Sequence, residues 1–156
     1  MKKVFVSIPL KGRSKDDIQK SLDRIQDAVK GLFDKEVEIL YQDLEDLPDF
    51  AKGDEGFEEN LDFLAKDIDL MKDADYFATI SNNWDFRHCR LEEDIFRAYK
   101  AKNWSEERDS IMEFSLNIIA PDLIKKEKEE AEKLFGMVFE RDKDYIEAEE
   151  ERINKD

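Results

Sequence analysis

Apolar positions in the first two thirds of the chain follow two different periods. Short apolar runs rich in β-branched and aromatic residues predict strands, whereas longer segments with an apolar residue every three or four positions predict amphipathic helices. The predicted strands are 4–8, 37–41 and 75–80, and the predicted helices are 14–33, 57–71 and 87–99. This alternation of strand and helix predicts a parallel sheet with helices on both of its faces.

The first helix carries a clear start signal. Ser14 is a favourable N-cap, and Asp16 and Asp17 in the first turn suit the positive end of the helix dipole. The apolar residues at helical spacing predict the buried faces of the first two helices. These are Ile18, Leu22, Ile25, Ala28, Val29 and Leu32 in the first helix, and Leu61, Leu64, Ile68 and Met71 in the second.

The last third of the chain is less regular. Alternating apolar residues from Met112 to Ala120 predict a fourth strand, although a buried helix could share these residues. A helix is predicted over 122–135, and residues 142–156 are a highly charged helix or a frayed tail. We therefore expect a single-domain Rossmann- or flavodoxin-like three-layer α/β fold, with four or five parallel strands, over residues 1–140. A charged C-terminal helix or tail should follow over residues 141–156.

Composition narrows the classes of function. The chain has 156 residues and a formal net charge of -15. That length fits one domain, and so acidic a protein repels nucleic-acid backbones, so we expect no nucleic-acid polymer as a partner. No apolar run approaches the length of a membrane span, so we expect no membrane partner either. Cys89 is the single cysteine, which excludes an intramolecular disulfide and fits a reducing, cytoplasmic location.

Metal and nucleotide-cofactor motifs are missing from the sequence. No cluster of His, Cys and Asp residues has the spacing of zinc ligands, and no glycine-rich phosphate loop occurs. We therefore predict no metal and no cofactor.

The carboxyl ends of the predicted strands should gather the chemistry, because ligands of open parallel sheets bind there. Three segments follow these ends: residues 7–13, the acidic loop 43–49, and the turn and helix start at 81–92. The acidic loop continues towards Gly53 and Gly56. A loop of this length in a compact domain is usually functional or mobile.

The third of these segments carries a resemblance to a known family. It reads Trp84-x-x-Arg87-x-Cys89-Arg90-Leu91-Glu92-x-x-Ile95-x-x-Ala98-Tyr99. The pattern resembles the segment of the nucleoside 2-deoxyribosyltransferase-like family in which a turn leads to a helix carrying a nucleophilic glutamate. The Pro9-x-x-Gly12 loop and the Ala74-Asp75 pair are also similar to that family, so the resemblance covers roughly residues 1–100.

The resemblance implies cleavage or transfer at the N-glycosidic bond of a (deoxy)nucleoside or nucleoside 5′-monophosphate. Glu92 is the implied nucleophile in a double displacement, and the alternative is a solvated surface glutamate. Because Glu92 lies one turn into its helix, we expect the helix dipole to keep it ionised. Asp43 is a candidate proton donor, although a solvated loop acid is its more ordinary role. The resemblance also implies a homo-oligomer.

Several residues are candidates for substrate binding. Arg87 and Arg90 could bind a phosphate at the helix start or pair with nearby acids. Trp84 and Phe86 could stack on a base or cover the core. The loop after the first strand could cradle a 5′-hydroxyl or phosphate, or be an ordinary turn. The full set is Ser7, Pro9, Lys11, Gly12, Arg13, Asn82, Trp84, Phe86, Arg87 and Arg90.

Two departures from the family pattern keep other functions open. Many members have a glycine between the turn and the glutamate, where this chain has His88-Cys89-Arg90, and residues 101–110 look like an insertion. These differences motivate a catalytically inactive nucleotide-binding or sequestering module. The acidic C-terminal region motivates another alternative, an acidic protein-interaction domain that docks a basic partner.

Overall fold

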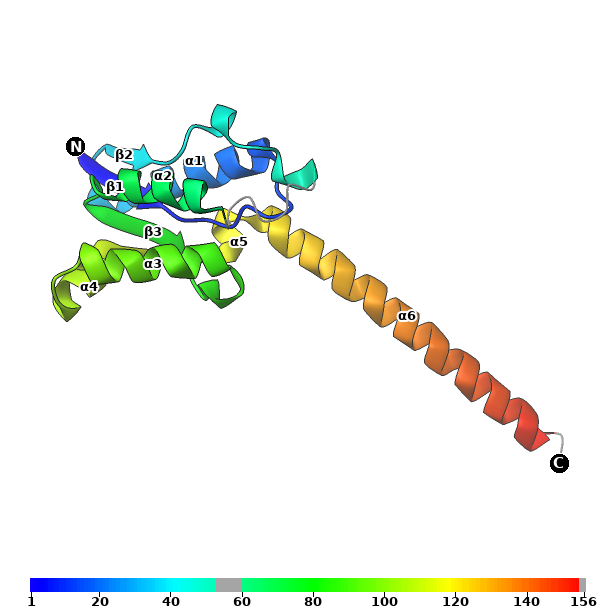
Figure 1. The fold of residues 1–156 in the computed structure, drawn as a ribbon. Helices are drawn as coiled ribbons and strands as arrows, with labels where there is room; N and C mark the ends of the chain where they lie inside the picture. The colour runs from blue at the N-terminus through cyan, green and yellow to red at the C-terminus, as the bar shows by residue number, and fades with distance from the viewer. Residues whose placement is uncertain (53–59, 155–156) are drawn as a thin grey trace. The chain divides into compact units, whose positions relative to one another are not determined.

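The computed structural model describes the backbone of residues 1–52 and 60–154. Within these residues, four strands form one parallel sheet in the order β2-β1-β3-β4 (Figure 1). The strands are β1 (Lys2–Val6), β2 (Val37–Leu40), β3 (Tyr76–Ile80) and β4 (Ile111–Phe114). The predicted parallel α/β sheet is therefore confirmed, and its strand order is consistent with a Rossmann- or flavodoxin-like fold.

Helices connect successive strands, as the sequence pattern predicts. α1 (Lys15–Phe33) follows β1, α2 (Leu61–Met71) precedes β3, and α3 (Arg87–Tyr99) follows β3. The segment that looked like an insertion holds α4 (Trp104–Ser110). The chain ends with α5 (Leu116–Ile119) and α6 (Pro121–Asn154), and short 3-10 turns occur at η1 (Leu44–Asp46), η2 (Phe50–Lys52) and η4 (Asn83–Asp85).

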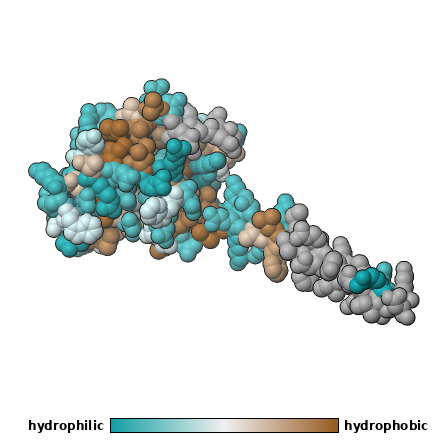
Figure 2. Space-filling view, turned by 60° about the horizontal axis from the view of Figure 1, so that its bottom comes forward, coloured by the Kyte–Doolittle hydropathy of each residue, from teal (hydrophilic) through white to brown (hydrophobic). Residues whose placement is uncertain are grey.

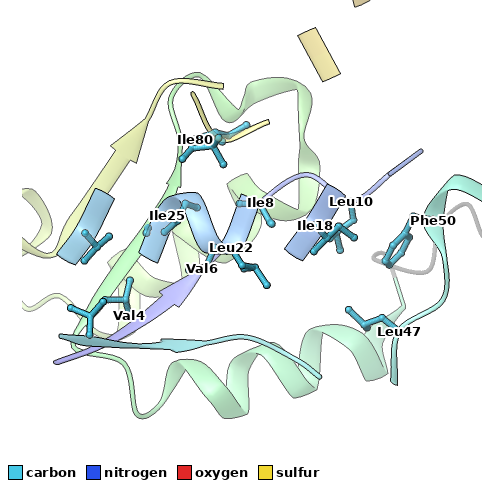
Figure 3. Close-up of a cluster of buried hydrophobic side chains, with 14 of the residues drawn as sticks. Val4, Val6, Ile8, Leu10, Ile18, Leu22, Ile25, Leu47, Phe50 and Ile80 are labelled. Atoms are coloured by element: carbon cyan, nitrogen blue, oxygen red, sulfur yellow. The ribbon is translucent and has the colours of Figure 1, made fainter. Parts of the chain in front are cut away.

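The core divides between the two faces of the sheet. On one face, side chains of the strands pack against α1; the residues include Val4, Val6, Ile80, Ile18, Leu22 and Ile25 (Figure 3). On the other face, Phe5 and Phe77 pack against Met71 of α2 and Phe96 of α3. The Phe77 ring centroid lies 5.7 Å from that of Phe5 and 5.3 Å from that of Phe96. Alternate side chains of the central strands thus serve opposite faces.

The start of α1 is capped as its sequence predicts. Ser14 Oγ accepts a hydrogen bond from the Asp17 backbone N–H at 3.1 Å, and the Asp17 carboxylate accepts one from the Ser14 backbone N–H at 3.3 Å. This reciprocal pair is a capping box, which satisfies two otherwise unpaired backbone donors. At the other end of the helix, Leu32 is 66% exposed, so its prediction as part of the buried face was wrong.

The buried face of α2 matches the prediction only in part. Met71 is buried as predicted, whereas the predicted Leu61 and Ile68 are exposed, and Phe63 and Asp67 are buried in addition. The spacing of four residues between successive buried positions is helical, but its middle position holds a carboxyl group. A buried face predicted from apolar residues alone leaves out Asp67, so it is centred on the wrong side of the helix.

The second half of the predicted strand over Met112–Ala120 is also wrong. β4 ends at Phe114, and after Ser115 the chain forms the short helix α5. Ile119 is fully buried, and its carbonyl oxygen accepts a hydrogen bond from Ser21 Oγ of α1 at 2.7 Å. The spacing of the apolar residues from Leu116 to Ile119 fits a helical turn as well as a strand. In the helical form Ile119 accepts the hydrogen bond from α1.

The chain divides into two units, Met1–Ala120 and Pro121–Asp156. In the second unit α6 is one continuous helix, so the two predicted segments are joined as far as Asn154, and residues 155–156 lie outside the described residues. Leu134 and Phe135 on this helix are exposed. The face of the first unit seen in Figure 2 is mostly hydrophilic with hydrophobic patches, as expected for a net charge of -15. Among the described residues, no helix combines the length and apolar character needed to cross a membrane.

Replacing Ser14 by alanine removes the acceptor for the Asp17 N–H. We expect the free energy of unfolding to fall by about 1 kcal/mol, the usual cost of losing an N-cap side chain, as measured by urea denaturation. Ser14→Asn keeps a side-chain acceptor and should remain close to the wild type. Equal stability of Ser14→Ala and the wild type would rule out a stabilising cap here.

Candidate active site

The side chains of β1 alternate between the two faces of the sheet. Val4 and Val6 pack with α1, whereas Phe5 packs with α2 and α3. Ser7 follows directly after the strand and continues the alternation on the same side as Phe5, where it is buried. The first polar side chain beyond β1 therefore faces α2 and α3 and not solvent.

Polar side chains also lie at the ends of the neighbouring strands, and together with Ser7 they form a row across the sheet. Continuing the β1–β2 register by two residues places Gln42 opposite Ser7, and continuing the β1–β3 register places Thr79 beside it. The row lies at the carboxyl ends of β1, β2 and β3. It includes the point between β1 and β3 where the strand order reverses, which is where open α/β sheets bind ligands.

Glu92 of α3 reaches this row. Its side chain is 2% exposed, and its Oε1 accepts a hydrogen bond from Ser7 Oγ at 3.1 Å. Phe96, one helical turn later, packs on Phe77 of β3, and this contact fixes which face of α3 lies against the sheet. The predicted pairing of the first loop with the glutamate helix is thus found at Ser7 and Glu92.

A second carboxyl group, Asp67 of α2, meets Glu92. Asp67 is 3% exposed, and its Oδ1 accepts a hydrogen bond from Gln42 Nε2 at 2.8 Å. The same Gln42 nitrogen donates to the carbonyl oxygen of Phe63 at 3.0 Å. Two buried carboxyl groups from different helices therefore face each other beneath the polar row.

Of the two carboxyl groups, Glu92 has the more strongly raised pKa. Burial, followed by the negative charge of Asp67 and a hydrogen bond to it, raises the pKa of Glu92 well above its ordinary value. Burial also raises the pKa of Asp67, but hydrogen bonds from Glu92 and Gln42 partly offset that rise. Glu92 Oε2 is buried without a hydrogen-bond partner among the described residues.

The expectation that the helix dipole keeps Glu92 ionised is wrong. A helix dipole contributes about 0.3–1 kcal/mol at an exposed position, whereas full burial shifts the pKa of a carboxyl group by up to about 3–5 units. Burial beside a second carboxyl group dominates here, so the pKa of Glu92 is raised, not lowered.

Three further titratable groups surround the pair. Burial and the nearby carboxylates raise the pKa of the Tyr41 phenol and of the Cys89 thiol well above their ordinary values, so both stay protonated. Cys89 is fully buried and packs inside the domain. His88 Nε2 lies 2.8 Å from the carbonyl oxygen of Ile8, and the positive form of His88 lowers the pKa of Asp67.

The charged residue Arg13 of the first loop is buried and stabilises the turn. Arg13 is fully buried and donates to the carbonyl oxygens of Pro9, at 3.0 Å, and Asp17, at 3.1 Å, and to Ser21 Oγ at 2.6 Å. These bonds tie the turn after β1 to α1. Gly12 allows that turn because its φ of 74° is unfavourable for other residues. Lys11 is the exposed cation of this loop, and the buried Arg13 faces the protein interior.

The turn after β3 places its candidates at the surface. Trp84 is 70% exposed, and the Arg90 guanidinium carbon lies 6.0 Å from the centroid of its ring. Arg87 is exposed, as is Asn82, whose backbone is left-handed at a φ of 57°. Phe86 is half-buried against the core. The turn therefore presents an aromatic ring and cations to solvent, in the segment that leads into the helix of Glu92.

Asp43 does not join the carboxyl pair. It is exposed, and its Oδ1 accepts a hydrogen bond from the Glu45 backbone N–H at 3.0 Å, which caps η1. It lines an open groove of about 590 Å³ between α1 and the loop after β2. The second carboxyl group at Glu92 is Asp67.

Sequence reasoning missed Asp67 and Gln42, although each left a signal. Asp67 occupies a buried-stripe position between Phe63 and Met71. Gln42 lies two residues after Leu40 and so shares its face of the sheet. Both signals need the true face of each element, which the sequence pattern did not settle.

Comparisons with protein-family models, with curated proteins and with solved structures find no match to this chain. The function is therefore inferred from the geometry of the site and from the sequence pattern around Glu92.

The shared proton makes folding stability depend on pH. Because the folded pKa of Glu92 lies above its ordinary value of 4.5, the folded protein keeps a proton that the unfolded chain has released. The free energy of unfolding should therefore fall as pH rises above 4.5, by up to about 1.4 kcal/mol per pH unit for one group, until the folded pKa is passed.

Glu92→Gln mimics the protonated form and should remove part of this slope. We expect it to be more stable than the wild type at pH 7, by a margin that shrinks towards pH 4.5, in urea denaturation across that range. Glu38→Gln, at an exposed position of β2, is the control and should leave the slope unchanged. Parallel stability curves for Glu92→Gln and the wild type would contradict a proton held on Glu92.

Proposed function

We propose that the protein cleaves or transfers at the N-glycosidic bond of a (deoxy)nucleoside or nucleoside 5′-monophosphate, with Glu92 as nucleophile and Asp67 as its proton partner. The observation that carries the proposal is the buried pair of Glu92 and Asp67 beside Ser7, at the strand-order reversal of a parallel sheet. The pattern from Trp84 to Tyr99, which resembles nucleoside 2-deoxyribosyltransferase-like proteins, supports the same assignment.

Two carboxyl groups with one proton suit a double displacement. Enzymes that retain configuration at a sugar carbon use one carboxylate as nucleophile and a second carboxyl group as acid and then base. Carboxyl groups at close range cannot both ionise easily, so their pKa values separate and their roles differ. Asp67 fits the role of acid better than Asp43, because Asp67 faces Glu92 and Asp43 caps η1 at the surface.

The proton moves before the sugar does. When substrate binds, the Glu92 proton passes to Asp67, and the freed Glu92 carboxylate attacks the anomeric carbon. The bond between that carbon and the base nitrogen breaks, and Asp67 gives its proton to the leaving base. Water or a second base then attacks the sugar–Glu92 ester and passes its proton to Asp67, which regenerates the free carboxyl pair.

Ser7 orients the nucleophile during these steps. Its hydroxyl donates to Glu92 Oε1 and lowers the pKa of Glu92, which opposes the effect of burial. The hydrogen bond therefore favours the ionised form that attacks, and it leaves Oε2 as the oxygen that exchanges the proton. A serine hydroxyl supplies this donor without adding a charge.

The rim supplies the positive charge that binding of a phosphate needs. Lys11, Arg87 and Arg90 are exposed cations in the segments that border the carboxyl pair, and Trp84 offers an aromatic face for a base. In a protein with a net charge of -15, such local cations are required to hold a nucleotide anion. We assign this activity to a three-layer domain that works as a cytoplasmic homo-oligomer.

A second candidate function is nucleotide binding without turnover. The observation that favours it is the burial of a protonated Glu92, since a neutral carboxyl group is a poor nucleophile. Calorimetry with nucleosides and their 5′-monophosphates separates the two candidates when run beside a base-release assay. Binding with no base release, with or without an acceptor base, would favour the binding module.

The enzymatic proposal predicts distinct losses for the two carboxyl groups. Glu92→Ala should abolish release of the free base, measured by chromatography, because it removes the nucleophile. Asp67→Asn should lower kcat about 10²- to 10⁴-fold, the usual contribution of a general acid.

Glu93→Gln is the matched control for these variants. Glu93 is the next residue of α3, but it pairs with Arg97 at 3.5 Å and not with Ser7. It should keep base release near the wild-type rate. Base release by a folded Glu92→Ala protein at the wild-type rate would refute the proposal.

A further inference from the structure

Gln42 is the one amide side chain that touches the carboxyl pair among the contacts of the described residues. Its Nε2 donates to Asp67 Oδ1 at 2.8 Å and to the carbonyl oxygen of Phe63 at 3.0 Å. A primary amide nitrogen has two N–H groups, so both are used by α2. Phe63 and Asp67 are one helical turn apart, and the amide therefore spans a single turn of that helix.

We propose that Gln42 is a positioning residue that holds Asp67 in the rotamer in which its carboxylate faces Glu92. The inference deepens the proposed function and rests on it. Gln42 acts through Asp67 and, in this arrangement, does not contact the reacting sugar. The amide holds Oδ1 of Asp67, while the Asp67 carboxyl group also interacts with Glu92.

The position of Gln42 in the sheet explains why it can do this. It lies just beyond β2 and opposite Ser7 in the extended register, so Ser7 holds Glu92 while Gln42 holds Asp67. Each carboxyl group is thus fixed from the sheet by one uncharged donor. Such support from a neighbouring side chain is what keeps reacting groups within a fraction of an ångström of a working geometry.

An uncharged donor also preserves the shared proton. The hydrogen bond from Gln42 lowers the pKa of Asp67, which favours the proton on Glu92. Because the amide is uncharged, this effect is smaller than that of a cation. An arginine or lysine beside Asp67 would form an ion pair and remove the tendency of Asp67 to take the proton.

Other groups that face the pair act on the same titration and must be considered in any pH experiment. These are His88 and Cys89 from the start of α3 and Tyr41, which directly follows β2; Arg13 acts on Tyr41. None of them changes in the variants proposed below, so differences between those variants and the wild type report on Gln42.

The test uses the full chain with Gln42→Met, which keeps the side-chain length and removes both N–H donors. The first measurement needs no activity: carboxyl ¹³C NMR follows the titration of Asp67 and Glu92. We expect the Asp67 midpoint to rise in Gln42→Met, because the carboxylate loses a donor. Gln19→Ala is the matched control, since Gln19 also donates to a carboxylate, Asp23 Oδ1 at 2.9 Å, but on the exposed face of α1.

The second measurement is base release from a deoxynucleoside 5′-monophosphate as a function of pH. Gln42→Met should lower kcat roughly 100-fold with little change in KM, the scale expected when a reacting group is misplaced by about 1 Å. Gln42→Glu restores a donor only when its own carboxyl group is protonated, so its optimum should move to lower pH. A residue that merely stabilised the fold would not move the optimum.

The outcomes separate the two proposals. An unchanged Asp67 titration in folded Gln42→Met overturns the role of Gln42, whatever the activity. If the wild type releases no base, the proposed function fails, while the NMR titration still decides whether Gln42 orients Asp67. If Gln42→Met does not fold, the titration of Gln42→Glu decides, and an Asp67 midpoint equal to that of the wild type overturns the inference.

Discussion

The burial of two carboxyl groups against each other is the constraint on which the rest of the site depends. Isolated in the interior, an ionised Glu92 or Asp67 would be strongly destabilising, and the protein meets this cost by sharing one proton and by supplying one neutral donor to each group. Ser7 donates to Glu92 and Gln42 donates to Asp67. Burial and mutual proximity raise the pKa of both carboxyl groups.

The sheet brings these groups together by its topology. β1 and β3 are neighbours with their helices on opposite faces, so the carboxyl end of β1 faces the helix that follows β3. Ser7 directly follows β1, and Glu92 lies on α3, 85 residues later in the chain. Asp67 comes from a third segment, α2, which packs on the same face. A parallel sheet gathers such distant residues because all its strands end at one edge.

The same region separates supporting residues from exposed ones. Arg13 is a candidate phosphate ligand by its charge. Its guanidinium instead donates to backbone carbonyl oxygens and stabilises the turn. The exposed cations Arg87 and Arg90 and the ring of Trp84 lie in the turn after β3 and at the start of α3. Charge alone therefore did not identify the residues that face a ligand, because a buried guanidinium satisfies backbone carbonyls as readily as it binds an anion.

The sequence by itself determined the parallel α/β architecture, the capped start of α1 and the position of Glu92, because hydrophobic period, an N-cap and a local motif are all short-range signals. Only the tertiary structure brings Asp67 and Gln42 together near Glu92 and raises the pKa of Glu92. Those facts depend on which face of α2 is buried and on the desolvation of groups far apart in the chain. Pairing and desolvation arise only when the elements pack, so no local pattern encodes them.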